Sequence, residues 1–236
     1  MAPVTSRVTI VSVFPGLLGT YGDVGNGIAL AHRLRARDLS AEVLRVEPGQ
    51  AIPTMGDIYL LGGGEDRAQA LATALIGDAL AQAVQRGATV LGVCAGFQIL
   101  GRAFTDATGT TYPGLGLLDV VTEPLSQRAV GEVVADCTLP GVGRLVGFEN
   151  HRGGTRLGTG AAPLAVVASG IGNALSVGTD GASCGRVLGT YLHGPVLALN
   201  PRFADHVLAG VVGELAPVDD DFARRARALR LSPDRA

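Results

Sequence analysis

The chain has 236 residues, of which 47% are hydrophobic and 4% aromatic, and its formal net charge is −2. This length allows one large α/β domain with a substantial core built mainly from Ala, Val, Leu and Ile. The nearly balanced charge lacks the basic footprint of a nucleic-acid-binding or membrane-surface protein, so we expect small molecules or proteins as partners.

The cysteines and the N-terminal sequence further narrow the class of protein to which the chain can belong. Cys94, Cys137 and Cys184 show no Cys-x-x-Cys spacing, which argues against a disulfide framework and a zinc site. The apolar run 8–14 is too short to span a bilayer, and no signal-peptide cleavage pattern precedes Pro15. We therefore expect a cytoplasmic protein without membrane insertion.

The first third of the chain alternates predicted strands and helices. Strands are predicted at Arg7–Val13, Ala41–Val46 and Asp57–Leu61. The glycine-rich loop 14–26 follows the first strand at the sheet edge where open α/β sheets bind ligands. Asn26 is expected to cap a helix that reaches Asp38. In that helix we expect Ile28, Leu30, Ala31 and Leu34 on the apolar side, and Arg33, Arg35 and Arg37 facing outward.

Three glycines, Gly62–Gly64, directly follow the third predicted strand. They allow backbone N–H groups to approach a ligand closely, although a simple turn would also use them. No Gly-Lys-Ser/Thr follows, so the segment is not a phosphate-binding P-loop. One long helix is predicted over residues 67–86, with Leu71, Leu75 and Leu80 as its apolar positions.

The most informative stretch is the predicted strand Thr89–Val93 and the turn Gly92-Val-Cys94-Ala-Gly96. This order of strand, small residues, nucleophile and helix matches the nucleophile elbow, with Cys in place of Ser. The N-terminus of the following helix favours the thiolate form of Cys94. A lone cysteine is more often a small core residue, but this setting favours a nucleophile.

Short strands are predicted in the second half of the chain, and a polar, turn-rich segment, 147–154, is expected at the mouth of a pocket. His193 follows the predicted strand Arg186–Tyr191 at the same sheet edge as Cys94, which makes it the best general base among four histidines. His32 and His206 fall in predicted helices and are expected to be ordinary surface or half-buried residues. As a candidate base, His151 ranks between these two and His193. The remaining predictions are strands at Leu115–Val121, Arg128–Asp136, Arg144–Gly147, Leu164–Ala168 and Asn173–Val177, a helix at Asn200–Val212 and an exposed final helix opened by Asp219–Asp221.

Three motifs in this order resemble the class I, triad-type glutamine amidotransferases over nearly the whole chain: Gly62-Gly-Gly64, Gly92-Val-Cys94-Ala-Gly96-Phe-Gln98 and Tyr191-Leu-His193-Gly-Pro195. Within that superfamily the chain is similar to cobyric acid synthase glutaminase domains and to the glutaminase subunits that work with the Mur-ligase-like protein MurT. The resemblance implies a single domain over residues 1–236, with a mostly parallel, flavodoxin-like central sheet flanked by helices.

The resemblance also implies an activity, the hydrolysis of L-glutamine to glutamate and ammonia. Cys94 would attack the carboxamide, His193 would transfer protons, and the N–H groups of Gly63 and Ala95 would hold the oxyanion. Arg128 and Gln98 resemble the positions that hold the α-carboxylate and the α-amino group, although Arg128 is equally compatible with a surface charge.

The chain departs from the family pattern behind the histidine. Many triad amidotransferases carry His-x-Glu, whereas Gly194 and Pro195 follow His193 here. The orienting carboxylate could be Glu149, it could be missing, or it could come from a partner subunit, and the last is the hypothesis we favour. It would make the partner obligatory for activity.

The favoured function is therefore the glutaminase subunit of a lipid II isoglutaminyl synthase. A MurT-like Mur ligase subunit would then bind ATP and Mg²⁺ and amidate the D-glutamate α-carboxyl of lipid II, while this chain would need no cofactor of its own. Two alternatives stay open: a cobyric acid synthase-like amidotransferase for another carboxylate, and a non-catalytic interaction module of the same fold. Because the chain starts at the first strand of the glutaminase, we expect a separate subunit.

Overall fold

The computed structural model describes residues 7–231, and the predicted domain limits at 1–6 and 232–236 lie outside the described residues. The central sheet has the strand order β11-β12-β4-β3-β1-β2. All neighbouring strands in it are parallel except β11, which is antiparallel to β12. The predicted mostly parallel sheet is confirmed. Its strands are β1 Val8–Val13, β2 Ala41–Val46, β3 Ile58–Leu61, β4 Thr89–Val93, β11 Ala182–Cys184 and β12 Val187–Thr190.

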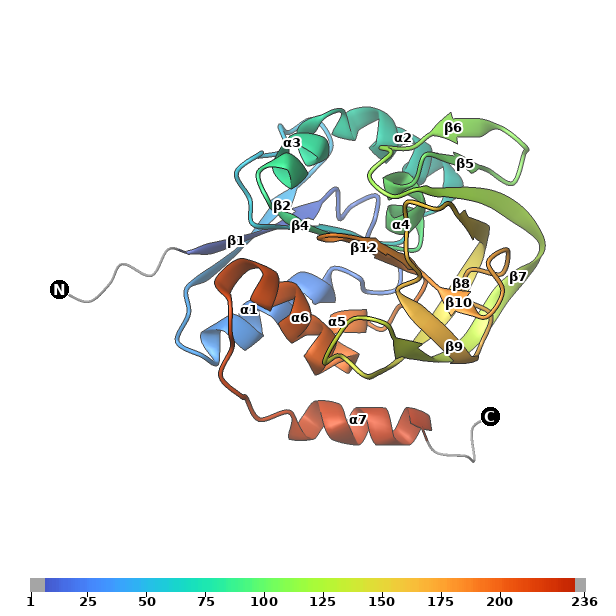
Figure 1. The fold of residues 1–236 in the computed structure, drawn as a ribbon. Coiled ribbons are helices and arrows are strands. Elements are labelled where there is room, and N and C mark those ends of the chain that lie inside the picture. Colours follow the sequence, from blue (N-terminus) through green and yellow to red (C-terminus); the bar gives the residue numbers. More distant parts are fainter. Residues whose placement is uncertain (1–6, 232–236) are drawn as a thin grey trace.

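Helices cover both faces of this sheet (Figure 1). The strands β1, β3, β4 and β12 are almost fully buried, as expected for parallel strands between two helical layers. One layer consists of α1 Gly25–Arg35, α5 Val196–Leu199 and α6 Pro201–Val212. The other consists of α2 Asp66–Ile76, α3 Ala79–Gln85 and α4 Ala95–Leu100.

A second, mainly antiparallel sheet lies beside the central one (Figure 1). Its order is β10-β9-β7-β5-β6, and β8 pairs with β7. The sequence predicted separate short strands here, but two long strands form its backbone because β7 and β8 pair over most of their length. The strands are β5 Ala103–Thr105, β6 Thr111–Pro113, β7 Val120–Cys137, β8 Arg144–Leu157, β9 Ala165–Ser169 and β10 Thr179–Asp180.

Several predicted elements are wrong in detail. The helix predicted over 67–86 is broken at Gly77, whose φ of 52° cannot continue a helix, and Leu71 lies exposed on α2. The polar segment 147–154 belongs to strand β8 and is not a turn. No strand covers the predicted segment 173–177.

The helix predicted at Asn26–Asp38 is shorter, and two of its side chains behave differently from the prediction. Asn26 lies inside α1 and does not cap it; its side chain instead accepts a hydrogen bond at 2.9 Å from the Leu197 N–H in the first turn of α5. Arg33 is buried although it was expected to face outward. Ile28 is 64% exposed although it was expected on the apolar side.

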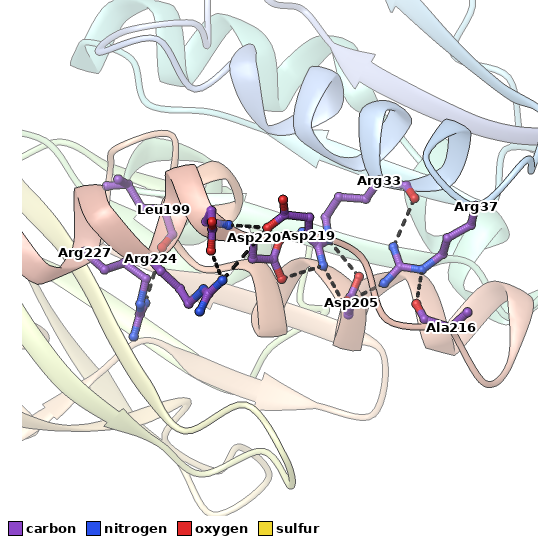
Figure 2. Close-up of polar contacts among 10 residues, drawn as sticks. Arg33, Arg37, Leu199, Asp205, Ala216, Asp219, Asp220, Arg224 and Arg227 are labelled. Atoms are coloured by element: carbon purple, nitrogen blue, oxygen red, sulfur yellow. Dashed lines mark hydrogen bonds and ion pairs between the residues drawn. The ribbon is translucent and has the colours of Figure 1, made fainter.

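Arg33 is buried because it joins the C-terminal segment to α1 (Figure 2). Its guanidinium contacts both carboxylate oxygens of Asp205 at 2.7 and 2.6 Å, and Asp220 at 2.5 Å. Burial alone would lower the pKa of Arg33, but the two carboxylates raise it overall. The final helix α7, Asp221–Leu231, has no buried residue, so the prediction of an exposed helix is confirmed.

Candidate active site

Cys94 occupies a nucleophile elbow between β4 and α4. Its φ of 53° is unusual for a residue with a side chain, and its N–H donates to the Thr190 carbonyl oxygen on β12 at 2.9 Å. The flanking glycines are required sterically. A Cβ on Gly92 would stand 2.6 Å from the backbone of Gly96, and one on Gly96 would stand 2.4 Å from the Leu61 carbonyl oxygen.

His193 stands three residues beyond the end of β12 and is fully buried. Its backbone N–H and C=O exchange hydrogen bonds with Phe148 on β8, at 2.8 and 3.2 Å. The Phe148 ring stacks on the imidazole at 5.4 Å between centroids, and the Tyr21 ring meets it edge-on at 4.9 Å. These contacts hold the imidazole in one orientation at the carboxyl edge of the central sheet.

The carboxylate behind His193 is Asp23. His193 Nδ1 lies 2.9 Å from Asp23 Oδ2 and 3.1 Å from Oδ1, and both side chains are fully shielded from solvent. The expectation that this chain lacks an acid for His193 is therefore wrong. Glu149 does not take that place, because its carboxylate pairs with His151 at 3.2 Å. An acid from a partner subunit is not needed to orient the imidazole.

The surroundings of His193 favour its protonated form. Burial alone would lower the pKa of His193, but Asp23 and Cys94 together raise it from 6.5 to about 9. Nε2 has no hydrogen-bond partner within the described residues. The imidazolium can therefore stabilise a neighbouring thiolate and later donate a proton through Nε2.

Gly63 lies between the members of the site. A Cβ built on it would stand 2.7 Å from His193 Cε1 and 3.5 Å from Cys94 Cβ, so the thiol-bearing and imidazole side chains flank the same peptide. The N–H of Gly63, predicted as an oxyanion donor, donates to Asp23 Oδ2 at 2.8 Å. Ala95 is the first residue of α4, where backbone N–H groups lack partners within the helix.

A cavity of about 450 Å³ opens beside Cys94. Arg128 lines it, and its Nε donates to Asn150 Oδ1. Gln98 lines it too, but its Oε1 accepts from Gln69 at 2.9 Å and its Nε2 donates to the Tyr191 hydroxyl at 3.2 Å. Of the predicted site residues, Gly63, Cys94, Ala95, Gln98 and Arg128 line this cavity, whereas His193 is fully buried and does not line it. Both ends of the Gln98 amide are already engaged.

Sequence reasoning missed two features of this site. Asp23 sits in the loop 14–26, whose sheet-edge position was a signal that it could reach the histidine. The second feature is a buried pair: Glu149 accepts the N–H groups of Ile171 and Gly172 at 2.7 and 2.8 Å, and contacts His151. The His151 ring stacks on Tyr191 at 3.7 Å, so this pair supports one wall of the cavity.

Within residues 7–231 no group of three or more His, Cys, Asp or Glu side chains could hold a metal ion. No helix in the same part of the chain is long and apolar enough to cross a membrane.

Comparisons with known proteins agree with this geometry. The model of the CobB/CobQ-like glutamine amidotransferase domain matches residues 30–201. The GatD subunit of lipid II isoglutaminyl synthase (glutamine-hydrolysing) from Staphylococcus aureus is 35% identical over 98% of this chain and 96% of its own length. A cobyric acid synthase from Rhodobacter capsulatus is 36% identical over 67% of this chain, which spans 34% of that protein.

A solved structure of a glutamine amidotransferase superposes with a TM-score of 0.59 at 22% identity, covering 87% of this chain and 99% of that one. This likeness supports the fold. The matched family model spans the strands and loops that carry Gly63, Cys94 and His193. The chain belongs to the CobB/CobQ-like glutamine amidotransferase domain family.

Proposed function

We propose that the chain is the glutaminase subunit of a lipid II isoglutaminyl synthase. The observation that carries this proposal is the 35% identity to the Staphylococcus aureus subunit over nearly the full length of both chains. The match to cobyric acid synthase spans only about a third of that enzyme. The match to the GatD subunit therefore supports a subunit that supplies ammonia more strongly than the match to cobyric acid synthase supports the alternative.

The site has the parts that glutamine hydrolysis needs. The Cys94 thiolate attacks the side-chain carboxamide carbon, an S–C bond forms, and the C–N bond then breaks as His193 gives its proton to the leaving ammonia. Neutral His193 next takes a proton from water, which attacks the γ-glutamyl thioester and releases glutamate. Asp23 keeps the imidazole oriented through both steps and stabilises its protonated form.

Arg128 is the group we assign to the α-carboxylate of glutamine, since a guanidinium can hold both carboxylate oxygens. Its Nε is held by Asn150 at the rim of the cavity, and part of the fork is left for a ligand. Gln98 is assigned to the α-amino end, and that role requires Gln98 to give up its contact with Gln69 or Tyr191 when substrate binds.

The second half of the reaction belongs to a partner. A MurT-like Mur ligase subunit would bind ATP and Mg²⁺ and activate the D-glutamate α-carboxyl of lipid II, and the ammonia released at Cys94 would amidate it. This assignment places the complex in the cytoplasm, and nucleic acid has no part in it.

Reconstitution with the MurT-like subunit tests the function. We expect mass spectrometry to show lipid II converted from carboxyl to carboxamide with ATP and glutamine. Cys94→Ala should stop this conversion, ammonium chloride should restore it, and Cys184→Ala, at an exposed thiol, serves as the control. An unchanged acceptor alongside intact glutamine hydrolysis would favour a cobyric acid synthase-like acceptor. Full amidation by Cys94→Ala with glutamine would favour a non-catalytic module.

A further inference from the structure

One oxygen of Asp23 serves two donors at once. Oδ2 accepts the Gly63 N–H at 2.8 Å and also contacts His193 Nδ1 at 2.9 Å. Asp23 is 3% exposed, so water does not compete for this carboxylate. The backbone donor assigned to the oxyanion is therefore already bound to the residue that orients the base.

The Gly63 peptide is held from both sides in this arrangement. The Gly63 N–H belongs to the Gly62–Gly63 peptide, whose carbonyl oxygen accepts the Gly96 N–H at 3.0 Å. The next peptide is held as well, because the Gly63 carbonyl oxygen accepts the Thr20 N–H at 3.1 Å. To bring its N–H to an atom bound to Cys94, the Gly62–Gly63 peptide has to turn away from Asp23 and from Gly96, and Gly63 tolerates such a turn because it has no side chain.

We propose that Asp23 is a positioning residue with a second role: it binds the Gly63 N–H in the resting chain, so that this donor reaches the oxyanion only after it leaves Asp23. The inference rests on the proposed glutaminase function. His193 need not move during the exchange, because its Nδ1 also lies 3.1 Å from Asp23 Oδ1. The resting chain thus keeps a formed acid–base pair and an incompletely formed oxyanion hole.

The two roles of Asp23 predict opposite effects when it is replaced. Asp23→Asn and Asp23→Ala remove the orienting charge behind His193, which should lower kcat for glutamine about 10²- to 10⁴-fold. Asp23→Ala also frees the Gly63 N–H, whereas the amide oxygen of Asp23→Asn can still accept it. In Asp23→Ala, the affinity for ligands that bind through the oxyanion hole and carry no leaving group should therefore rise.

L-glutamate γ-semialdehyde is a probe with these properties. Cys94 adds to its aldehyde carbon, an S–C bond forms, the C=O π bond breaks, and the thiol proton ends on the former carbonyl oxygen. No group leaves, and the oxygen of the hemithioacetal occupies the oxyanion position. We expect the aldehyde to inhibit Asp23→Ala about tenfold more tightly than it inhibits wild type, the worth of one additional hydrogen bond to that oxygen. Asp23→Asn, which keeps an acceptor for the Gly63 N–H, should show no such gain.

The measurements are made on the chain in complex with its partner, with Asp78→Asn as a charge-matched control at an exposed site between α2 and α3. Tighter aldehyde binding together with a lower kcat in Asp23→Ala supports the inference. Aldehyde binding that is unchanged or weaker in Asp23→Ala overturns it. If the wild-type complex does not hydrolyse glutamine, the proposed function is refuted instead. The two failures are therefore distinguishable.

A second measurement needs no replacement of Asp23. In wild-type protein labelled with ¹⁵N-glycine, the Gly63 amide resonance can be assigned by its loss in Gly63→Ala. We expect this resonance to shift when the aldehyde adduct forms, because the N–H exchanges a carboxylate for the adduct oxygen. A Gly63 resonance that keeps its position in the adduct contradicts the exchange.

Discussion

Gly63 has no room for a side chain, and this makes Gly63→Ala a direct test of the site geometry. The added Cβ would stand 2.7 Å from His193 Cε1, and real Cβ contacts are essentially never below 3.0 Å and are ordinary only from 3.4 Å, so the imidazole must move by about 0.3–0.7 Å. The Asp23 carboxylate and the Cys94 Cβ, at 3.3 and 3.5 Å from the same point, close the other directions. The displacement therefore falls on His193.

A misplacement of this size should lower kcat/KM for glutamine about 100-fold, because displacements near 1 Å at a reacting group have costs of that order. The free energy of unfolding should fall by about 1–3 kcal/mol, as for other overpacked sites, and the protein should remain folded. Steady-state glutaminase assays of the reconstituted complex, together with urea denaturation of the chain, measure both quantities.

The matched control is Gly131→Ala. Gly131 lies on β7, and a Cβ there would meet no atom within 4 Å, so activity and stability should match those of wild type. The reasoning is refuted if Gly63→Ala hydrolyses glutamine as fast as Gly131→Ala. It is also refuted if both variants lose activity equally.

Three further predictions concern the substrate, the base and the C-terminal segment. Arg128→Gln should raise KM for glutamine about 10- to 100-fold with little change in kcat, and an unchanged KM would remove Arg128 from the binding site. Because Asp23 and Cys94 raise the pKa of His193 to about 9, the stability from its protonated form is complete below pH 6.5 and is lost as pH rises through 9. His193→Gln should lack this loss in urea titrations across that range, and an identical slope would contradict it. Arg33→Met leaves Asp205 and Asp220 without this partner and should lower the free energy of unfolding by about 2 kcal/mol, whereas the exposed Arg35→Met should not.

The central sheet and the elbow at Cys94 were predictable because local sequence determines them. A buried parallel strand appears as a continuous apolar run, and the elbow requires small residues at Gly92 and Gly96 whatever lies elsewhere in the chain. The location of His193 followed from the same rule, since the carboxyl ends of β4 and β12 share one sheet edge.

The features that could not be predicted from the sequence depend on contacts between residues that are distant along the chain. Asp23 and His193 are 170 positions apart, and no local pattern marks an aspartate in a glycine-rich loop as the partner of a particular histidine. Arg33 was expected in solvent because the acids that pair with it lie on α6 and on the segment before α7. The second sheet was predicted in fragments because β7 and β8 gain their length from each other.

The pairing of β12 with β4 determines how late during synthesis of the chain the site can be completed. Val187 pairs with Val90 and Thr190 with Val93, yet the whole second sheet is synthesised between these two strands. A chain still on the ribosome that has emerged only as far as β10 carries Cys94 without His193. The pairing of Cys94 with His193 is therefore completed only when β12, the last strand of the described residues, has been made, and a prematurely terminated chain carries Cys94 without His193.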